Sequence, residues 1–139
     1  MNIVLDTNVL VAGLLTPSGT CGGIVRSLTS GDLTLCVDAR ILFEYEDVLR
    51  RPRFGIDAAA IDVLLDYIVD SAIQCPSSPL SPSLPDPDDT AFLEVALAGQ
   101  AACLATGNLK HFPSRLRHGV LVLSPGQFVA YWEKRGTSG

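Results

Sequence analysis

The hydrophobic and polar positions of this chain follow two alternating patterns, one typical of strands and one typical of helices. Short and mostly apolar runs predict buried strands of a parallel sheet at 3–5, 33–37, 102–105 and 120–123. Apolar residues at helical spacing predict helices at 9–15, 20–30, 39–50, 57–73 and 92–97, and after Ser124. This alternation favours an α/β fold, a three-layer α/β/α sandwich with a mainly parallel central sheet.

The length of the chain fits a single domain. Its 139 residues suffice to bury a core without metal or disulfide staples. We expect 1–134 to form this domain and 135–139 to be a flexible C-terminal tail. The Pro- and Ser-rich stretch at 76–87 is too short to separate two domains, so we expect it to be an irregular loop.

Nothing in the hydrophobic pattern indicates a membrane protein. No apolar run approaches the roughly 18–20 residues that span a bilayer. The N-terminus also lacks the basic and apolar regions of a signal peptide. We therefore expect a cytoplasmic protein with no membrane contact.

Composition limits the possible chemistry. The net charge of -5 argues against a protein that coats nucleic acid electrostatically. It does not exclude a metal-dependent enzyme, because carboxylates gathered around a cation also make the charge negative. The four cysteines are widely spaced and only two histidines are present, which favours buried free thiols over a zinc site.

Asp6 is the first polar residue after the N-terminal strand, and Thr7 and Asn8 follow it directly. In open parallel sheets, ligands and catalytic groups collect at the carboxyl ends of the strands, where Asp6 is expected to lie. Asp, Thr and Asn are also common N-cap residues. This stretch alone supports a helix cap and a functional site equally.

More polar side chains follow other predicted strands or begin neighbouring helices. A doubly wound sheet would bring them to the same crevice as Asp6. Unpaired carboxylates there would raise one another's pKa, and a divalent cation would remove that repulsion. Oxygen ligands favour Mg²⁺ or Mn²⁺ over zinc. The candidates are Asp6, Asn8, Glu44 or Glu46 (which periodicity cannot separate), Asp88, Asp89, Thr106 and Asn108.

Four segments resemble the PIN-domain ribonucleases, in the same order along the chain. They are LDTNVL at 5–10, EYEDVLRRPRF at 44–54, DPDDTAFLEVALAGQA at 86–101 and ATGNLKHFP at 105–113. The resemblance covers almost the whole chain and is strongest to the VapC-like toxins of bacterial toxin–antitoxin systems. It implies a PIN-like fold and an endoribonuclease that depends on Mg²⁺ or Mn²⁺.

The resemblance also assigns three catalytic and metal-binding acids. The first follows the first strand and corresponds to Asp6. The second lies in the EYEDVL helix and favours Glu44 over Glu46. The third precedes the FLEVAL helix and corresponds to Asp89, with Asp88 as a neighbour able to substitute for it.

Supporting positions follow from the same resemblance. Asn8 and Thr106 match small polar residues that orient the acids or the water around the metal. Asn108 stands where PIN domains often carry Asp; its amide accepts a hydrogen bond or orients water but brings no negative charge. One bound metal is therefore the safer expectation. Glu94 is an additional candidate ligand, although a surface glutamate is the simpler interpretation.

The sequence carries less information about the substrate and the partners than about the fold and the acids. Lys110, Arg115 and Arg50 are candidates for guiding the RNA backbone, and a plain solvated surface explains these side chains equally well. The resemblance implies an RNA substrate, a small antitoxin protein and a homodimer.

Two other functions compete with the ribonuclease. One is a PIN-fold module that binds RNA or protein with little or no turnover, which Asn108 and the acidic composition favour. The other is a receiver-like phosphotransfer domain with an acidic Mg²⁺ pocket. It would need a phosphoacceptor Asp at the end of a middle strand, and the sequence offers no convincing one.

Overall fold

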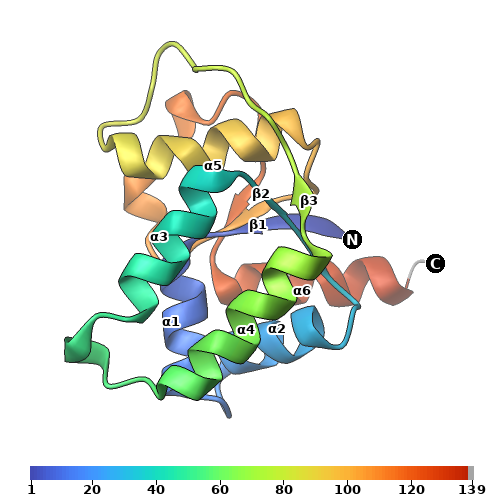
Figure 1. Cartoon of the computed structure of the whole chain (residues 1–139). Coiled ribbons are helices and arrows are strands. Elements are labelled where there is room, and N and C mark those ends of the chain that lie inside the picture. The colour runs from blue at the N-terminus through green and yellow to red at the C-terminus, as the bar shows by residue number, and fades with distance from the viewer. Residues whose placement is uncertain (138–139) are drawn as a thin grey trace.

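The computed structural model describes residues 1–137 of the chain (Figure 1). Within them, a parallel sheet is built from β1 (Asn2–Leu5), β2 (Thr34–Val37), β3 (Ile73–Gln74), β4 (Leu104–Ala105) and β5 (Val122–Leu123). The α-helices are α1 (Thr7–Leu15), α2 (Thr20–Thr29), α3 (Ala39–Leu49), α4 (Ala58–Ser71), α5 (Pro87–Ala98) and α6 (Pro125–Thr137). Three 3-10 turns are η1 (Pro52–Phe54), η2 (Leu109–His111) and η3 (Ser114–Leu116). The predicted α/β/α fold with a parallel sheet is confirmed.

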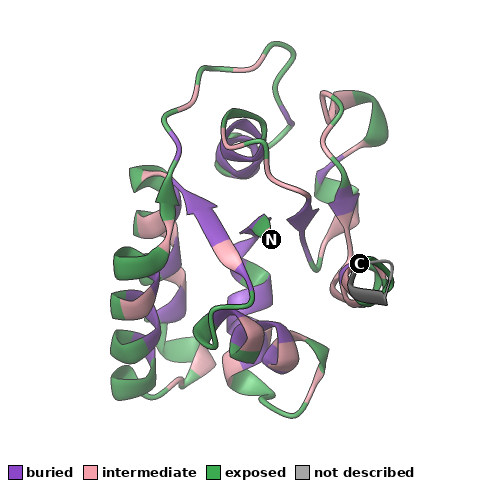
Figure 2. Cartoon of the chain, turned by 90° about the vertical axis from the view of Figure 1, so that its right-hand side faces the viewer, coloured by how far each residue is buried: buried purple, intermediate pink, exposed green. Residues whose placement is uncertain are grey.

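The helices form two layers around the sheet (Figures 1 and 2). Helix α5 packs on β1 and β2 from one side, while α1, α2, α4 and α6 lie on the other. Helix α3 contacts α1, α4 and α5. The strands at the centre are mostly buried and the outer helix surfaces are exposed (Figure 2). This arrangement buries a core on both faces of the sheet, as the apolar strand sequences require.

The strand order is β3-β2-β1-β4-β5, so the direction of winding reverses between β1 and β4. Such a switch point opens a crevice at the carboxyl ends of the two strands. Leu5 pairs with Ala105 in the register of β1 and β4, which places the next residues, Asp6 and Thr106, side by side. A receiver-like fold has the order 2-1-3-4-5. The receiver-like alternative is therefore wrong.

The prediction of a helix over 57–73 is wrong at its C-terminal end. Helix α4 stops at Ser71, Ala72 is extended, and Ile73 pairs with Cys36 as part of β3. Ile73, the last residue of the predicted helix, is 41% exposed on the sheet edge. A strand of two residues is too short to show a periodic pattern, and its pairing with β2 alone defines it.

The boundary expected for the C-terminal tail also differs. Helix α6 includes residues 135–137 of the predicted tail, while 138–139 lie outside the described residues. Arg135 Nη1 donates a hydrogen bond to Tyr131 Oη at 2.7 Å, and the Arg135 guanidinium lies 5.1 Å from the centre of that ring. This contact between residues four apart supports the last turns of the helix.

Two other expectations can be compared with the structure. Residues 75–86, between β3 and α5, form no helix or strand, as predicted for the Pro- and Ser-rich stretch. Cys36, Cys75 and Cys103 are buried free thiols.

Within 1–137 no single helix is both long and apolar enough to cross a membrane. Helices α1 and α2 reach the necessary length and apolar composition only as a pair, and this pair is bent by 103° at its junction.

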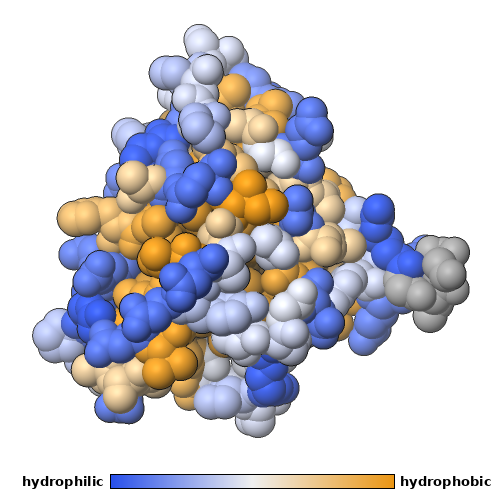
Figure 3. All heavy atoms as spheres, turned by 45° about the vertical axis from the view of Figure 1, so that its right-hand side comes forward, coloured by the Kyte–Doolittle hydropathy of each residue, from blue (hydrophilic) through white to orange (hydrophobic). Residues whose placement is uncertain are grey.

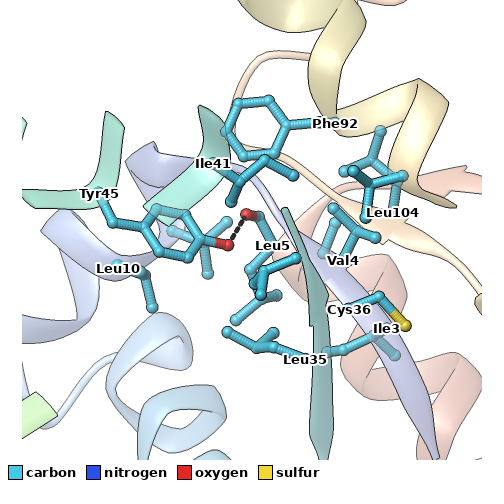
Figure 4. Close-up of a cluster of buried hydrophobic side chains, with 14 of the residues drawn as sticks. Ile3, Val4, Leu5, Leu10, Leu35, Cys36, Ile41, Tyr45, Phe92 and Leu104 are labelled. Carbon is cyan, nitrogen blue, oxygen red and sulfur yellow. Dashed lines mark hydrogen bonds between the residues drawn. The ribbon is translucent and has the colours of Figure 1, made fainter. Parts of the chain in front are cut away.

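Tyr45 joins α3 to the end of β1 (Figure 4). Its ring is fully buried among core side chains, with the Phe92 ring centre 6.3 Å away. Its hydroxyl donates a hydrogen bond of 2.6 Å to the carbonyl oxygen of Leu5. The bond satisfies a buried backbone acceptor at the point where β1 ends and the candidate site begins.

Replacing Tyr45 by Phe removes the donor and leaves the ring in place. We expect Tyr45→Phe to lower the free energy of unfolding by about 1–3 kcal/mol, because the Leu5 carbonyl remains buried without this partner. Urea unfolding followed by circular dichroism measures the change. Tyr67→Phe, at a half-buried position of α4, is the matched control, and an equal loss in both variants would contradict a special role for the Tyr45 hydroxyl.

Candidate active site at the sheet switch point

Asp6 occupies the N-cap position of α1, but its side chain makes no capping hydrogen bond. Its Oδ2 instead accepts hydrogen bonds from Thr106 Oγ1 at 2.8 Å and from Asn8 Nδ2 at 3.3 Å. The carboxylate is buried at the crevice between β1 and β4. Capping therefore does not explain the position of this side chain, which is held by Thr106 and Asn8 instead.

Asn8 and Thr106, two of the four predicted supporting residues, both donate hydrogen bonds to Asp6. Besides donating to Asp6, Asn8 accepts a hydrogen bond through Oδ1 from the Gly107 backbone N–H at 2.9 Å. Thr106 Oγ1 accepts from the Asn108 backbone N–H at 3.0 Å. Each side chain thus ties the turn after β4 to the turn after β1 and fixes the orientation of the Asp6 carboxylate.

Glu44 reaches the same place from α3. Its Oε2 accepts a hydrogen bond from Thr7 Oγ1 at 3.1 Å, and Thr7 follows Asp6 directly. Glu46 points elsewhere, because it is exposed and pairs with Arg50 at 3.4 Å. The geometry separates the two glutamates that periodicity could not, and it brings Glu44 to the crevice.

The acidic run before α5 divides into a cap and two candidate ligands. Asp86 is the N-cap, with its side chain accepting a hydrogen bond from the Asp88 backbone N–H at 2.9 Å. Asp88 is exposed. Asp89 is 9% exposed, and its Oδ2 is the one buried side-chain oxygen or nitrogen without a hydrogen-bond partner among residues 1–137. Such an atom is usually satisfied by a cation, a proton or an ordered water molecule.

His111 lies beside this oxygen and was missed as a site residue by the sequence reasoning. Its Nδ1 is 3.3 Å from Asp89 Oδ2, within ion-pair distance but outside hydrogen-bond geometry. Asn108 Nδ2 lies 2.9 Å from His111 Nε2 and is the donor, which leaves the ring proton on Nδ1 when the ring is neutral. The only sequence signal was the spacing of three residues between Asn108 and His111, which a 3-10 turn brings together.

Burial raises the pKa of all three acids, and repulsion from neighbouring carboxylates adds to the shift for Glu44 and Asp89. Burial raises the pKa of Asp6, although the hydrogen bond from Thr106 opposes the shift. Burial also raises the pKa of Glu44, and the negative charges of Asp6, Asp88 and Asp89 add to it. Burial, followed by the charges of Asp6 and Asp86, raises the pKa of Asp89 to about 6. The three carboxylates thus lie in surroundings that disfavour their charged forms, and a positively charged partner would stabilise them.

The donor set is of the type that a hard divalent cation prefers. Carboxylate oxygens are the usual ligands of Mg²⁺ and Mn²⁺, and the unpartnered Asp89 Oδ2 provides one free position. Within 1–137, however, no three His, Cys, Asp or Glu side chains already converge in a metal-binding group. The residues fit a cation chemically, and their side chains would have to converge further to hold it.

A cleft of about 510 Å³ opens beside the acids. It runs between α3 and the start of α5, and Glu44 and Asp88 both line it. Its apolar wall includes Phe43, Ala91 and Phe92, and the Phe43 ring is 75% exposed. The cleft stops short of Asp6 and Asp89, so it leads to the acids without enclosing them.

The predicted substrate-binding residues lie in different surroundings. Arg50, at the C-terminal end of α3, pairs with Glu46 and at 2.6 Å with Asp62. Lys110 is exposed in η2 next to His111, and Arg115 is exposed in η3. Lys110 is thus a chain neighbour of His111, whereas Arg50 is paired with Glu46 and Asp62.

Comparison with known proteins identifies the family. The PIN-domain family model matches residues 2–110. The match covers most of the chain, so the chain belongs to the PIN-domain family. No curated protein sequence matches it.

One solved structure shows the same fold. The crystal structure of VapBC2 from Rickettsia felis bound to a DNA fragment from their promoter matches with a TM-score of 0.59 and 16% sequence identity. The match covers 89% of this chain and 98% of that chain. At this identity the likeness concerns the fold, which agrees with the sheet order and the two helical layers described above.

The raised pKa of Asp89 predicts that this residue destabilises the metal-free protein. A carboxyl with a folded-state pKa near 6 and an unfolded value near 4 opposes folding when both states are ionised. We expect Asp89→Asn to raise the free energy of unfolding in EDTA by roughly 1–3 kcal/mol at pH 7.5. The gain should shrink as the pH falls below 6 and disappear below about 4, where the carboxyl is protonated in both states.

Urea unfolding across this pH range measures the effect. Asp66→Asn, at an exposed position of α4, is the control and should show no such dependence. A loss of stability on Asp89→Asn at pH 7.5 would contradict the strained state of the carboxylate.

Proposed function

We propose that this PIN-domain protein is a metal-dependent endoribonuclease that hydrolyses RNA phosphodiester bonds. The proposal is supported most by the electrostatic repulsion that links Asp6, Glu44 and Asp89 near the switch point, with Asp89 Oδ2 buried and without a hydrogen bond. Membership of the PIN-domain family supports a nuclease class of activity. RNA as the substrate and the need for Mg²⁺ or Mn²⁺ are our own assignments.

Asp6, Glu44 and Asp89 would hold the cation. When bound, the cation supplies charge neutralisation to the phosphodiester and activates water for in-line attack. Thr106 and Asn8 hold Asp6 in one orientation through their hydrogen bonds, and Thr7 does the same for Glu44. These contacts orient Asp6 and Glu44 before the substrate arrives, which favours electrostatic catalysis.

Two further groups act at the edge of the site. Asn108 keeps the His111 proton on Nδ1, the ring atom that faces Asp89. Lys110 lies next to His111 and presents a positive charge to an approaching phosphate backbone. Arg115 and Arg50 are weaker candidates for binding the phosphate backbone, because Arg50 already forms an ion pair with Asp62.

A toxin–antitoxin setting is part of the proposal. The fold likeness to VapBC2, whose crystal structure contains promoter DNA, supports a small antitoxin as the protein partner. Exposed apolar side chains offer contact surface: Phe43 stands beside the cleft, and Val63 and Val69 lie on α4. Figure 3 shows hydrophobic atoms reaching one face of the molecule in separate patches between hydrophilic ones. We extend the proposal to a homodimer and a cytoplasmic location.

A PIN-fold binding module with little or no turnover is the second candidate. One observation favours it: the Asn108 amide is hydrogen-bonded to His111, so this position adds no carboxylate to the site. Three acids crowded at one crevice oppose it, because binding alone does not require their repulsion.

RNA cleavage separates the two functions. We expect the wild-type protein, freed of any bound partner, to cut mixed cellular RNA into discrete products with Mg²⁺ or Mn²⁺ and to be inactive in EDTA. Asp6→Asn should lower the rate at least a hundredfold, because the amide keeps the acceptor for Thr106 but loses the charge. Gel or sequencing analysis of the products measures this.

The matched control is Asp70→Asn, an equal change of charge at an exposed position of α4. It should cleave as the wild type does. Cleavage that persists in EDTA or in Asp6→Asn would contradict the proposal, and RNA binding without cleavage would favour the binding module.

Asn108→Asp tests how the fourth position affects the metal. A carboxylate added beside the three acids should tighten Mn²⁺ binding by about tenfold, because ligand charge increases affinity for hard cations. Calorimetric titration of both proteins measures the dissociation constants. Unchanged or weaker binding would mean that the hydrogen bond from Asn108 to His111 matters more than added charge.

A further inference from the structure

Glu94 is a buried acid that the proposed chemistry does not use. It is 7% exposed in α5, so the surface glutamate expected from the sequence is wrong. Both carboxylate oxygens are occupied: Oε1 contacts Arg40 Nη1 at 2.7 Å, and Oε2 accepts a hydrogen bond from the Leu80 backbone N–H at 2.9 Å. Both carboxylate oxygens of Glu94 are therefore bound to neighbouring protein groups, and in this respect Glu94 differs from the three site acids.

Arg40 is the centre of a network that spans three segments. Besides Glu94 in α5, its guanidinium contacts Asp38 Oδ2 through Nε at 2.9 Å and through Nη2 at 2.7 Å. The same Nη2 donates to Ser77 Oγ at 3.0 Å, in the loop before α5. Asp38 in turn caps α3 by accepting a hydrogen bond from the Ile41 backbone N–H. One guanidinium thus joins the start of α3, the middle of α5 and the 75–86 loop.

The network lies next to two of the site acids. Glu44 comes four residues after Arg40 in α3, one turn along the same side of the helix. Asp89 comes five residues before Glu94 in α5. Two helices that each carry a site acid are therefore joined by an ion pair about one turn away from each acid.

The loop held by this network leads directly to Asp89. Ser77 and Leu80 are fixed by Arg40 and Glu94, and the Leu84 backbone N–H donates to Thr90 Oγ1 at 3.2 Å. The loop then ends at the cap of α5, three residues before Asp89. The start of α5 is thereby fixed from both the loop and α3.

We infer that Arg40 and Glu94 are positioning residues that set the spacing between Glu44 and Asp89 for joint cation binding. The inference rests on the proposed function, since it assigns both acids to one cation. Groups that orient metal ligands without touching the metal change affinity by about 10- to 100-fold when removed. The pair acts in this way by fixing α3 against α5.

Arg40→Met gives the decisive test, because two explanations predict opposite results. Removing a positive charge near an acidic site tightens cation binding if only electrostatics acts. If the pair positions the acids, Arg40→Met weakens Mn²⁺ binding by about tenfold or more. Calorimetric titration of Mn²⁺ into the metal-free full chain measures the dissociation constant without any RNA.

Three more variants complete the design. Glu94→Gln should also weaken Mn²⁺ binding, and the double variant should lose less than the sum of the two single losses, because both changes affect the Arg40–Glu94 contact. Arg40→Lys keeps the charge and should recover part of the affinity. Asp62→Asn is the matched control: it breaks the Arg50 ion pair that joins the far end of α3 to α4, and should bind Mn²⁺ as the wild type does.

Circular dichroism confirms that each variant is folded, and Arg40, at 50% side-chain exposure, tolerates replacement even if Glu94 does not. Equal or tighter Mn²⁺ binding by folded Arg40→Met overturns the inference, as does equal weakening by Asp62→Asn. The proposed function is judged separately by RNA cleavage of the wild type, so either can fail without the other.

Discussion

The hydrogen bond from Tyr45 to the Leu5 carbonyl is the constraint on which the site depends most directly. Leu5 is the last residue of β1 and Asp6 follows it; Tyr45 lies in α3 and Glu44 precedes it. One buried contact therefore fixes the strand end and the helix that supply the first two acids. The parallel register of β1 and β4 adds Thr106 to the same point, because Leu5 and Ala105 pair just before the strands end. The other residues of the site lie around this end of β1.

The fold holds the acids together against their own repulsion. Asp6 receives two side-chain hydrogen bonds that favour its charged form, whereas Asp89 Oδ2 receives none and the pKa of Asp89 rises to about 6. A scaffold selected only for stability would place an amide or an apolar group there. Strain of this kind, concentrated where a polar atom lacks a partner, is typical of a functional site.

The sequence predicted the fold more completely than it predicted the contacts of the candidate acids. Apolar runs indicated four of the strands because burial on both faces leaves a clear signal, but Ile73 in β3 was assigned to a helix, since a two-residue strand has no period. Asp6 could not be separated from a helix cap until its hydrogen bonds were known. Glu94 and His111 were not recognised as parts of a network, because their partners come from distant or turn-forming segments that no spacing rule connects. Local patterns thus predict elements, and the tertiary structure decides which polar groups meet.

A cation bound at this crevice would relieve the repulsion among the acids, and the ionisation of Asp89 reports such binding most directly. Carbon-13 NMR of the Asp89 carboxyl, assigned by comparison with Asp89→Asn, gives its pKa with and without Mg²⁺. We predict a pKa near 6 in EDTA and a marked fall at saturating Mg²⁺, because the bound cation stabilises the carboxylate. An ordinary pKa near 4 in EDTA, or a raised pKa that Mg²⁺ leaves unchanged, would contradict a metal site at this crevice.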